Sequence, residues 1–186
     1  AKYHMNDPLI VQYGRYMFDV LRGDLGPSYR YKDHDVNFYI FQSLPNSMIL
    51  GVIAISISIL FGITSGMLAA VRQNTWVDYL SMALAVIGIS VPLFVIGPVL
   101  QYIFAMKLQW LPTSGWFTAG GGIKTIILPA LTLAFADFAT IARLTRSSML
   151  ETLRSDYIRT AKAKGMKSSA IIFKHSMKGA MLPIVS

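Results

Sequence analysis

Side chains that could carry out catalysis or bind a metal are few in this sequence, and they lie far apart. The chain has no cysteine, which excludes a disulfide framework, a cysteine nucleophile and a cysteine-based metal site. Its histidines, His4, His34 and His175, are too scattered to predict a metal centre. It also lacks the Gly-x-x-x-x-Gly-Lys-Ser/Thr loop that binds nucleotide phosphates. We therefore expect no catalytic site, no metal and no cofactor held by this chain.

The densest group of reactive side chains is a basic segment between two apolar ones. Residues 143–178 hold nine Lys or Arg and two acidic residues, Glu151 and Asp156. The centre of this segment, from Tyr157 to Gly165, has the sequence YIRTAKAKG, with small residues just before a glycine. Glycine readily ends helices, so the pattern predicts a helix–turn–helix that a partner can approach closely. A solvated basic loop, or an amphipathic helix on anionic lipid headgroups, would have the same composition.

One ionisable residue, Asp137, falls inside a predicted membrane span at about residues 125–142. The Ile, Leu and Phe residues of this span contribute roughly −2.4 to −4.8 kcal/mol to insertion, and a central Asp costs about 2.5 to 3.5 kcal/mol. Because these contributions nearly cancel, we expect Asp137 to face the interior of a helix bundle. It is then either a hydrogen-bonding or water-facing group between helices, or a residue of a translocation path.

The elements that would position these residues are apolar helices. The chain has 186 residues, of which 54% are hydrophobic and 14% charged, whereas soluble domains have about 25% charged residues. The net charge of +8 does not favour nucleic-acid binding, since nine of the 17 Lys and Arg residues lie in the single basic segment. The composition therefore predicts an all-α polytopic membrane protein, with its spans within residues 36–142.

The first predicted span, at about residues 47–70, carries a seam of small residues. It belongs to an uncharged stretch from residue 36 to residue 71 and is longer than the roughly 20 residues that cross the hydrocarbon. Small side chains at every fourth position let another helix come close, either within the chain or in a dimer. The seam comprises Ala54, Ser58, Gly62, Gly66 and Ala70.

The second predicted span, at about residues 79–106, contains two prolines. Pro92 and Pro98 should kink or locally unwind it, because proline lacks a backbone N–H and clashes with the preceding turn. A membrane bundle tolerates such a break when neighbouring groups satisfy the freed carbonyls. The kinked helix either lines a substrate path or is an ordinary irregularity of the bundle.

The flanking segments set the predicted topology. Residues 1–35 predict a short amphipathic helix and a loop, which either pack against the membrane domain or form a binding site. Basic segments stay on the cytoplasmic side, so we expect residues 143–178 there. Because successive spans alternate in direction, residues 72–78 should also lie inside, and residues 1–35 and 107–124 outside. Residues 179–186 resemble the start of a further span. An earlier helix is also required, so we expect the sequence to be the middle of a longer protein.

Several longer motifs together carry a resemblance to a known family, and they cover essentially the whole chain. They are LGPSYRYKD (25–33), LAAVRQNTWVDY (68–79), IGISVPLFVIGPVL (87–100), LQWLPTSGW (108–116), IARLTRSSMLETLRSD (141–156), YIRTAKAKG (157–165) and KHSMKGAMLPIVS (174–186). The combination resembles the inner-membrane permease subunit of ABC importers of the oligopeptide/dipeptide family. The resemblance is closest to the B-type permease of oligopeptide systems.

The cytoplasmic motif of that family has the general form Glu-Ala-Ala, three residues, Gly, nine residues, Ile-x-Leu-Pro. Aligned on Gly165, this chain matches only at Ala161 and Gly165. Arg159 stands at the acidic position and Thr160 at the first alanine. The Ile-x-Leu-Pro slot does not match, and Leu182-Pro183 comes five residues later. The Arg-Thr-Ala sequence and the later Leu-Pro resemble the version of this motif that peptide permeases have.

The resemblance implies a type I ABC importer permease fold in a bacterial inner membrane, here an incomplete portion with about three full spans. A second homologous permease, two cytoplasmic ATPases that bind the ATP, and an extracytoplasmic peptide-binding protein would be its partners. The loop 157–183 would dock on an ATPase, and the chain would not be an enzyme by itself. Oligopeptides are the expected cargo, with dipeptides, nickel or glutathione as alternatives. An ATP-independent carrier or scaffold is the alternative outside the family.

Two groups of site residues are expected, the first from the resemblance and the second from the ionisable residue and the prolines of the predicted spans. In the docking loop, small residues would allow close approach, isoleucines and Phe173 would anchor a short helix, and basic residues would meet acidic groups of the ATPase. This group comprises Tyr157, Arg159, Thr160, Ala161, Lys162, Ala163, Lys164, Gly165, Ile171, Ile172 and Phe173. The second group, Asp137, Pro92 and Pro98, is expected along the translocation path.

Overall fold

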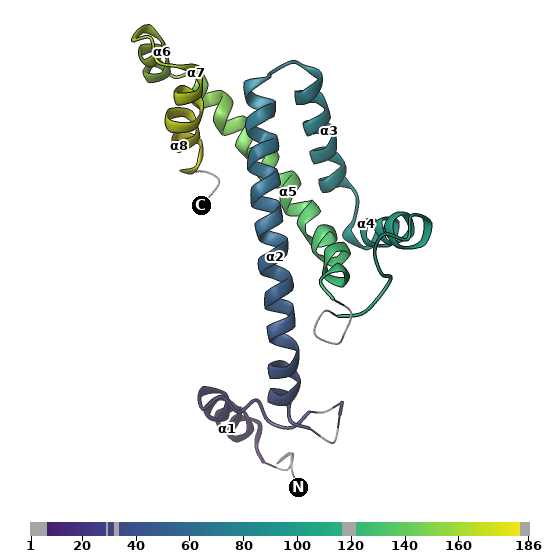
Figure 1. Ribbon diagram of the computed structural model, residues 1–186. Coiled ribbons are helices and arrows are strands. Elements are labelled where there is room, and N and C mark those ends of the chain that lie inside the picture. The colour runs from purple at the N-terminus through teal and green to yellow at the C-terminus, as the bar shows by residue number, and fades with distance from the viewer. Residues whose placement is uncertain (1–6, 29, 32–33, 117–121, 183–186) are drawn as a thin grey trace. The chain divides into compact units, whose positions relative to one another are not determined.

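The computed structural model describes residues 7–28, 30–31, 34–116 and 122–182 (Figure 1). Its regular elements are all helical, as the sequence predicts. They are α1 (Leu9–Leu21), α2 (Val36–Val71), α3 (Trp76–Ser90), α4 (Leu93–Leu100), the π-helix η1 (Gln101–Lys107), α5 (Lys124–Leu153), α6 (Asp156–Ala163), α7 (Ser168–Ala170), the π-helix η3 (Ile171–Ser176) and α8 (Met177–Ala180). His4 and Pro183, named in the sequence predictions, lie outside the described residues.

The chain divides into two compact units, residues 1–49 and 50–186. In the first, α1 occupies the position expected for a short amphipathic helix, and none of its residues is buried. The loop after α1 is held by Asn37 in the first turn of α2. The backbone N–H of Leu25 donates to Asn37 Oδ1 at 3.0 Å, and Asn37 Nδ2 donates to the carbonyl of Gly23 at 2.5 Å. The C-terminal end of α1 is thereby tied to the start of α2.

Two helices, α2 and α5, are each long and apolar enough to cross a membrane. Both exceed the predicted spans. Helix α2 begins at Val36 rather than near residue 47 and contains Pro45, and α5 continues past residue 142 to Leu153. The predicted ends were set by polarity. Polarity marks where hydrocarbon stops, whereas a helix continues for as long as its backbone hydrogen bonds are made.

The predicted second span is sharply bent instead of continuous. At the break between helix α3 and the helical run Leu93–Lys107, the helix axis bends by 114°. Val91 between them is extended, with φ −91° and ψ 123°, because a residue before proline is disfavoured in the helical region. Pro98, which was also expected to interrupt the span, lies inside α4. Of the two prolines, Pro92 makes the break.

The seam of small residues on α2 lies against α5. All five of its residues are buried. A Cβ placed on Gly62 would stand 2.7 Å from the side chain of Ile141, and one on Gly66 would collide with the carbonyl oxygen of Ala142. The hydroxyl of Ser58 donates to a backbone carbonyl of α5 at 3.0 Å. The seam thus forms a helix–helix contact within the chain.

Helix α3 packs against α5 in a similar way. A Cβ on Gly88 would lie 2.7 Å from the Cβ of Ala139 and 3.0 Å from the carbonyl oxygen of Phe135. Ala85 and Ala139 are both buried. Helix α5 therefore contacts both α2 and α3, and its C-terminal end leads directly into α6.

Candidate functional site

The residues expected to dock on a partner begin with α6, which closes in a glycine-ended turn. Gly165 has φ +73°, a left-handed conformation that suits glycine. Its N–H donates to the carbonyl of Lys162 at 3.0 Å, and the N–H of Met166 donates to that of Ala161 at 3.3 Å. These two bonds make a Schellman motif, which satisfies the last carbonyls of the helix. The predicted glycine break is therefore a defined turn.

A small apolar cluster holds α6 against the helical run that follows. It consists of Ile158, Ala161 and Ile171, with Met166 packed against it. Ala161 was expected to face a partner, yet it is only 7% exposed because its methyl group belongs to this cluster. Ile171 is likewise buried. Both residues hold the docking segment together from within, as expected of an anchoring Ile171. The role expected of Ala161 in the close approach of a partner stays a prediction.

A second contact joins this segment to the long helices. Buried Ala70 of α2, Met149 of α5 and Ala180 of α8 form a cluster, and Ile172 packs against it. The phenol of Tyr157 donates to the carbonyl of His175 at 3.1 Å, which ties α6 to η3. Residues 156–180, which we call the docking segment, are thus anchored on the ends of α2 and α5.

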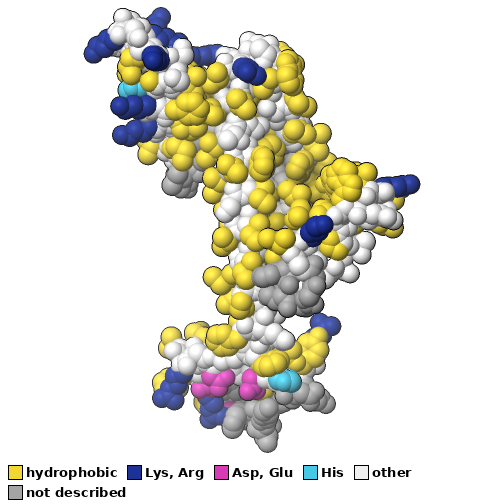
Figure 2. All heavy atoms as spheres, in the orientation of Figure 1, with side chains coloured by type: hydrophobic (Ala, Val, Ile, Leu, Met, Phe, Trp, Pro, Cys, Tyr) yellow, Lys and Arg dark blue, Asp and Glu magenta, His cyan; other side chains and the backbone are white. Residues whose placement is uncertain are grey.

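The outer surface of the docking segment is basic and aromatic. Figure 2 shows Lys and Arg side chains gathered over this end of the second unit. The exposed basic residues are Arg159, Lys162, Lys164, Lys167, Lys174 and Lys178. Phe173 is 63% exposed and Tyr157 48% exposed, while Thr160 and Ala163 also lie on the surface. Asp156 is the one acidic residue in the segment, and it pairs with Arg159 at 3.3 Å in an exposed contact.

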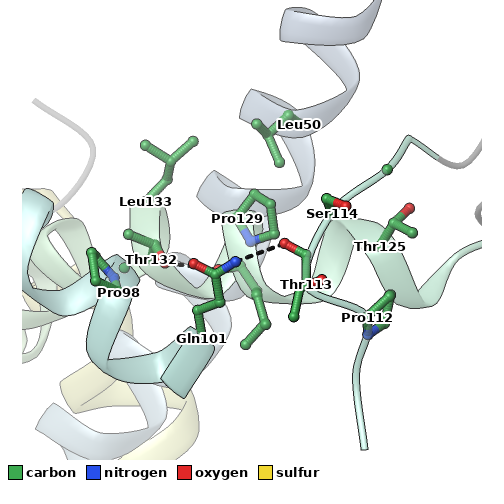
Figure 3. A pocket seen from close by; sticks show the side chains of 13 residues that line it. Leu50, Pro98, Gln101, Pro112, Thr113, Ser114, Thr125, Pro129, Thr132 and Leu133 are labelled. Atoms are coloured by element: carbon green, nitrogen blue, oxygen red, sulfur yellow. Dashed lines mark hydrogen bonds between the residues drawn. The ribbon is translucent and has the colours of Figure 1, made fainter. Parts of the chain in front are cut away.

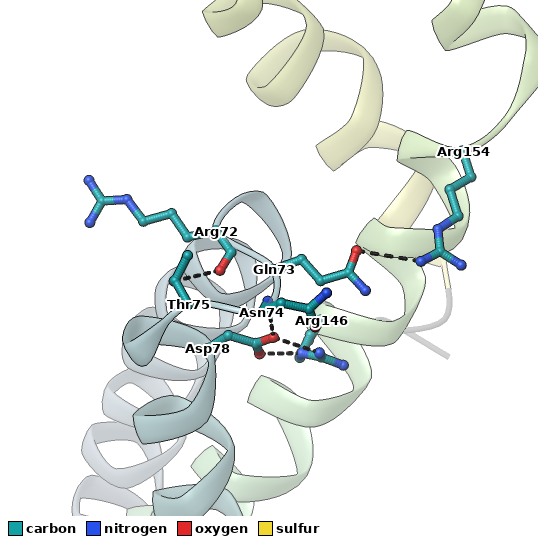
Figure 4. Close-up of polar contacts among 7 residues, drawn as sticks. All are labelled: Arg72, Gln73, Asn74, Thr75, Asp78, Arg146 and Arg154. Atoms are coloured by element: carbon teal, nitrogen blue, oxygen red, sulfur yellow. Dashed lines mark hydrogen bonds and ion pairs between the residues drawn. The ribbon is translucent and has the colours of Figure 1, made fainter.

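An ion pair lies where α3 meets α5, close to the docking segment (Figure 4). Arg146 Nε donates to Asp78 Oδ1 at 2.5 Å, and a terminal guanidinium nitrogen donates to Oδ2 at 2.8 Å. Oδ2 also accepts the backbone N–H of Asn74 at 3.0 Å. Asp78 is 2% exposed. A single buried carboxylate therefore joins the turn after α2, the start of α3 and the C-terminal third of α5.

The residues expected along a translocation path are not brought together. Asp137 is exposed on α5, although we expected it to face the bundle interior. The neighbouring positions on α5 that contact α2 and α3 are small and apolar, such as Ala134 and Ala139, and Asp137 projects from another side of the helix. Pro92 lies at the bend between α3 and α4. Pro98 lines a separate cavity.

That cavity has a volume of about 460 Å³ and lies between α4, η1, α5 and residues 112–115 (Figure 3). Its walls are largely apolar, with Pro98, Pro129 and Leu133 among them. Gln101 points into the same region and donates to the carbonyl of Thr113 at 2.7 Å. Charged side chains are absent from the described lining residues. The cavity therefore offers apolar contact and neutral hydrogen-bonding groups.

Comparison with known proteins connects this arrangement to a family. Residues 62–186, from Gly62 of the α2 seam to the C-terminal end, match the binding-protein-dependent transport system inner membrane component family. The chain belongs to this family. Over all 186 residues it is 47% identical to the oligopeptide transport system permease protein OppB of Salmonella typhimurium and to that of Escherichia coli K12. It is 42% identical to the dipeptide transport system permease protein DppB of Bacillus subtilis.

The chain spans about 60% of the length of these curated relatives. The family match includes α3, the broken span, α5 and the whole docking segment as far as it is described. The sequence-based resemblance to oligopeptide and dipeptide permeases is confirmed.

Two features of this permease-family chain were missed by reasoning from its sequence. Ile158 is fully buried and central to the small cluster of the docking segment. A signal for it exists, since Ile158 and Ala161 are three positions apart and so share one face of the predicted helix. The pair of Asp78 and Arg146 was also missed. Asp78 is the one acidic residue between Asp35 and Asp137, which could have marked it for a specific partner.

Proposed function

We propose that this chain is part of a permease subunit of an ATP-driven importer in a bacterial inner membrane, and that its cargo is oligopeptides. Membership of the binding-protein-dependent family supports an importer over an ATP-independent carrier or scaffold. The identity of 47% along the whole chain to two proteins named as oligopeptide permeases supports the cargo class.

The observation that carries the coupling mechanism is the two-sided docking segment. Its inner side chains, Ile158, Ile171 and Ile172, pack within the segment or on α2 and α5. Its outer side exposes lysines together with Tyr157 and Phe173. Exposed aromatic side chains on the same segment as exposed basic residues suit an acidic groove with an apolar floor on a partner protein. That partner is a cytoplasmic ATPase subunit, which binds the ATP, so this chain needs no cofactor of its own.

The proposed topology follows from the docking of this segment on an ATPase in the cytoplasm. Residues 72–78 and 143–178 lie in the cytoplasm, and residues 1–35 and 107–124 lie outside. The complete assembly contains a second homologous permease, two ATPases and an extracytoplasmic peptide-binding protein. Closure of the two ATPases on ATP moves the docking segment, and the packed helices follow as a rigid body.

The translocation path is proposed to use Asp137, which is exposed on α5 of this chain. An ionised carboxylate facing lipid would be costly, so in the full assembly another helix or a water-filled path must cover it. The bend at Pro92 and the region of Pro98 are proposed to border the same path. The similarity to a dipeptide permease favours dipeptides as the second candidate cargo.

The experiment that tests the function is uptake of a labelled tripeptide by proteoliposomes that contain the full-length parent protein and its partner subunits. ATP-dependent uptake that unlabelled pentapeptides inhibit is the expected result for an oligopeptide importer. Inhibition by unlabelled dipeptides alone would indicate that the cargo is dipeptides, the second candidate. Absence of ATP dependence in an assembled complex would overturn the proposal.

The docking surface is tested separately with Gly165→Asp in the full-length parent protein. No described residue lies within 4 Å of a Cβ at this position, so a new side chain would project outward toward the partner. Aspartate tolerates the left-handed conformation of Gly165 better than most residues do. We expect normal membrane insertion and loss of ATPase co-purification. Retained co-purification with normal uptake would contradict docking at this turn.

A further inference from the structure

The pair of buried Asp78 and Arg146, whose side chain is 25% exposed, makes contacts that a simple surface ion pair lacks. Both carboxylate oxygens accept guanidinium N–H groups, at 2.5 and 2.8 Å. This two-pronged geometry fixes direction as well as distance, which a single contact does not. The same carboxylate accepts the N–H of Asn74, whose φ of +62° marks the tight turn between α2 and α3.

The pair also lies in the most constrained part of α5. Thr145 next to Arg146 is fully buried, and its Cβ would lie 2.7 Å from a Cβ at Gly66 on α2, second only to the carbonyl oxygen of Ala142. Met149, one turn further on, packs with Ala70 and Ala180. Leu153, the end of α5, is seven positions after Arg146, which is about 10 Å along the helix axis. The docking segment begins just beyond.

Stability alone is a weak explanation for such a pair. Apolar side chains of similar volume often stabilise a buried site equally well, whereas removing one charge leaves the other unpaired at a large cost. What a two-pronged pair adds is a fixed register. Small residues such as Gly88 and Ala139 offer no polar contact between α3 and α5, whereas sliding of α3 along α5 would break both hydrogen bonds between Asp78 and Arg146 at once.

We propose that Asp78 and Arg146 are positioning residues that lock α3 to α5, so that a displacement of the docking segment moves both helices together. This inference rests on the proposed function. Movement at α6 then reaches the start of α3 directly and, through the bend at Pro92, reaches α4. Without the pair, α5 moves while α3 lags, and ATP hydrolysis no longer drives transport efficiently.

The test uses the full-length parent protein assembled with its partners in proteoliposomes. Three properties are measured for each variant: ATPase co-purification, thermal stability, and peptide taken up per ATP hydrolysed. Asp78→Asn and Arg146→Gln each leave an unpaired polar partner, so both should lower stability and reduce peptide per ATP at least tenfold. Arg146→Lys keeps the charge without the two-pronged geometry, so it should give an intermediate ratio. Co-purification should persist in all three.

The double variant Asp78→Asn/Arg146→Gln separates positioning from stability, because it leaves no unpaired buried charge. We expect its thermal stability to recover toward the parent value while peptide per ATP stays low. If thermal stability and peptide taken up per ATP recover together, the pair has only a structural role and the inference is overturned.

Arg143→Gln is the matched control, since Arg143 is exposed on the same helix and should change none of the three properties. If the unmodified complex itself shows no ATP-driven uptake, the proposed function fails and not the locking of the helices. Loss of co-purification in step with peptide per ATP would also overturn the inference, by placing the defect at docking.

Discussion

At the scale of single residues, Gly165 shows how backbone conformation constrains the docking turn. The two hydrogen bonds of the turn require its positive φ, which costs most residues about 1–2 kcal/mol. Asparagine accepts this conformation more readily than alanine does. Gly165→Ala should therefore loosen the end of α6, and Gly165→Asn should do so less. Amide hydrogen exchange of α6 in the full-length protein measures the difference, and equal exchange in both variants would contradict the backbone explanation.

Gly66 depends on a different physical property, which is close packing. Its missing side chain leaves room for the carbonyl of Ala142, so Gly66→Ala forces the backbones of α2 and α5 apart. We expect the free energy of unfolding to fall by about 1–3 kcal/mol, the usual range for overpacked sites. Gly51→Ala is the control on the same helix, because nothing lies within 4 Å of a Cβ there. Thermal unfolding of the purified full-length protein should rank Gly66→Ala clearly below Gly51→Ala, and equal midpoints would refute the packing argument.

At the scale of elements, the docking segment combines an internal cluster with a basic outer surface. Reversing two exposed charges by Lys162→Glu/Lys164→Glu should weaken ATPase association about tenfold, most strongly at low salt, because like charges would then face each other. The fold should persist, since neither lysine is buried. Lys107→Glu, also exposed but at the end of η1, should leave association unchanged. A salt-independent loss of binding would indicate unfolding of the segment instead.

The elements also show what the sequence could predict and what it could not. The helical seam from Ala54 to Ala70 was predictable, because periodicity reports directly which face of a helix is buried. The break at Pro92 was predictable for the same local reason. The burial of Ala161 was not predictable, because its spacing does not reveal that α6 folds back onto Ile171. Contacts between residues distant in sequence, such as Asp78 with Arg146, could not be predicted, because local sequence patterns do not report which distant residues meet.

At the scale of the whole molecule, Asp137 is the residue whose surroundings this chain does not complete. It is exposed here, and a carboxylate exposed to lipid would be strongly disfavoured. If it lines the path, Asp137→Asn should slow peptide uptake several-fold while the assembled complex keeps its partners. Uptake and co-purification with the second permease are measured together in proteoliposomes.

Thr64→Val serves as the comparison for Asp137→Asn. Thr64 is also exposed within a span, but its hydroxyl bonds to the carbonyl of Leu60 in its own helix. Its replacement should therefore change neither measurement. If Asp137→Asn disrupts assembly and not uptake per complex, the carboxylate belongs to a subunit interface and not to the path.

The bend at Pro92 has a consequence for the lipid around the protein. Helix α3 has 15 residues and is about 22 Å long, whereas the hydrocarbon of a bilayer is about 30 Å thick. Unpaired carbonyls at its end cannot face acyl chains, so protein, water or a locally thinned leaflet must surround them. A membrane with shorter acyl chains is thinner, so its bilayer deforms less around this short helix. The lipid composition of the cell is therefore part of the environment to which this permease-family chain is fitted.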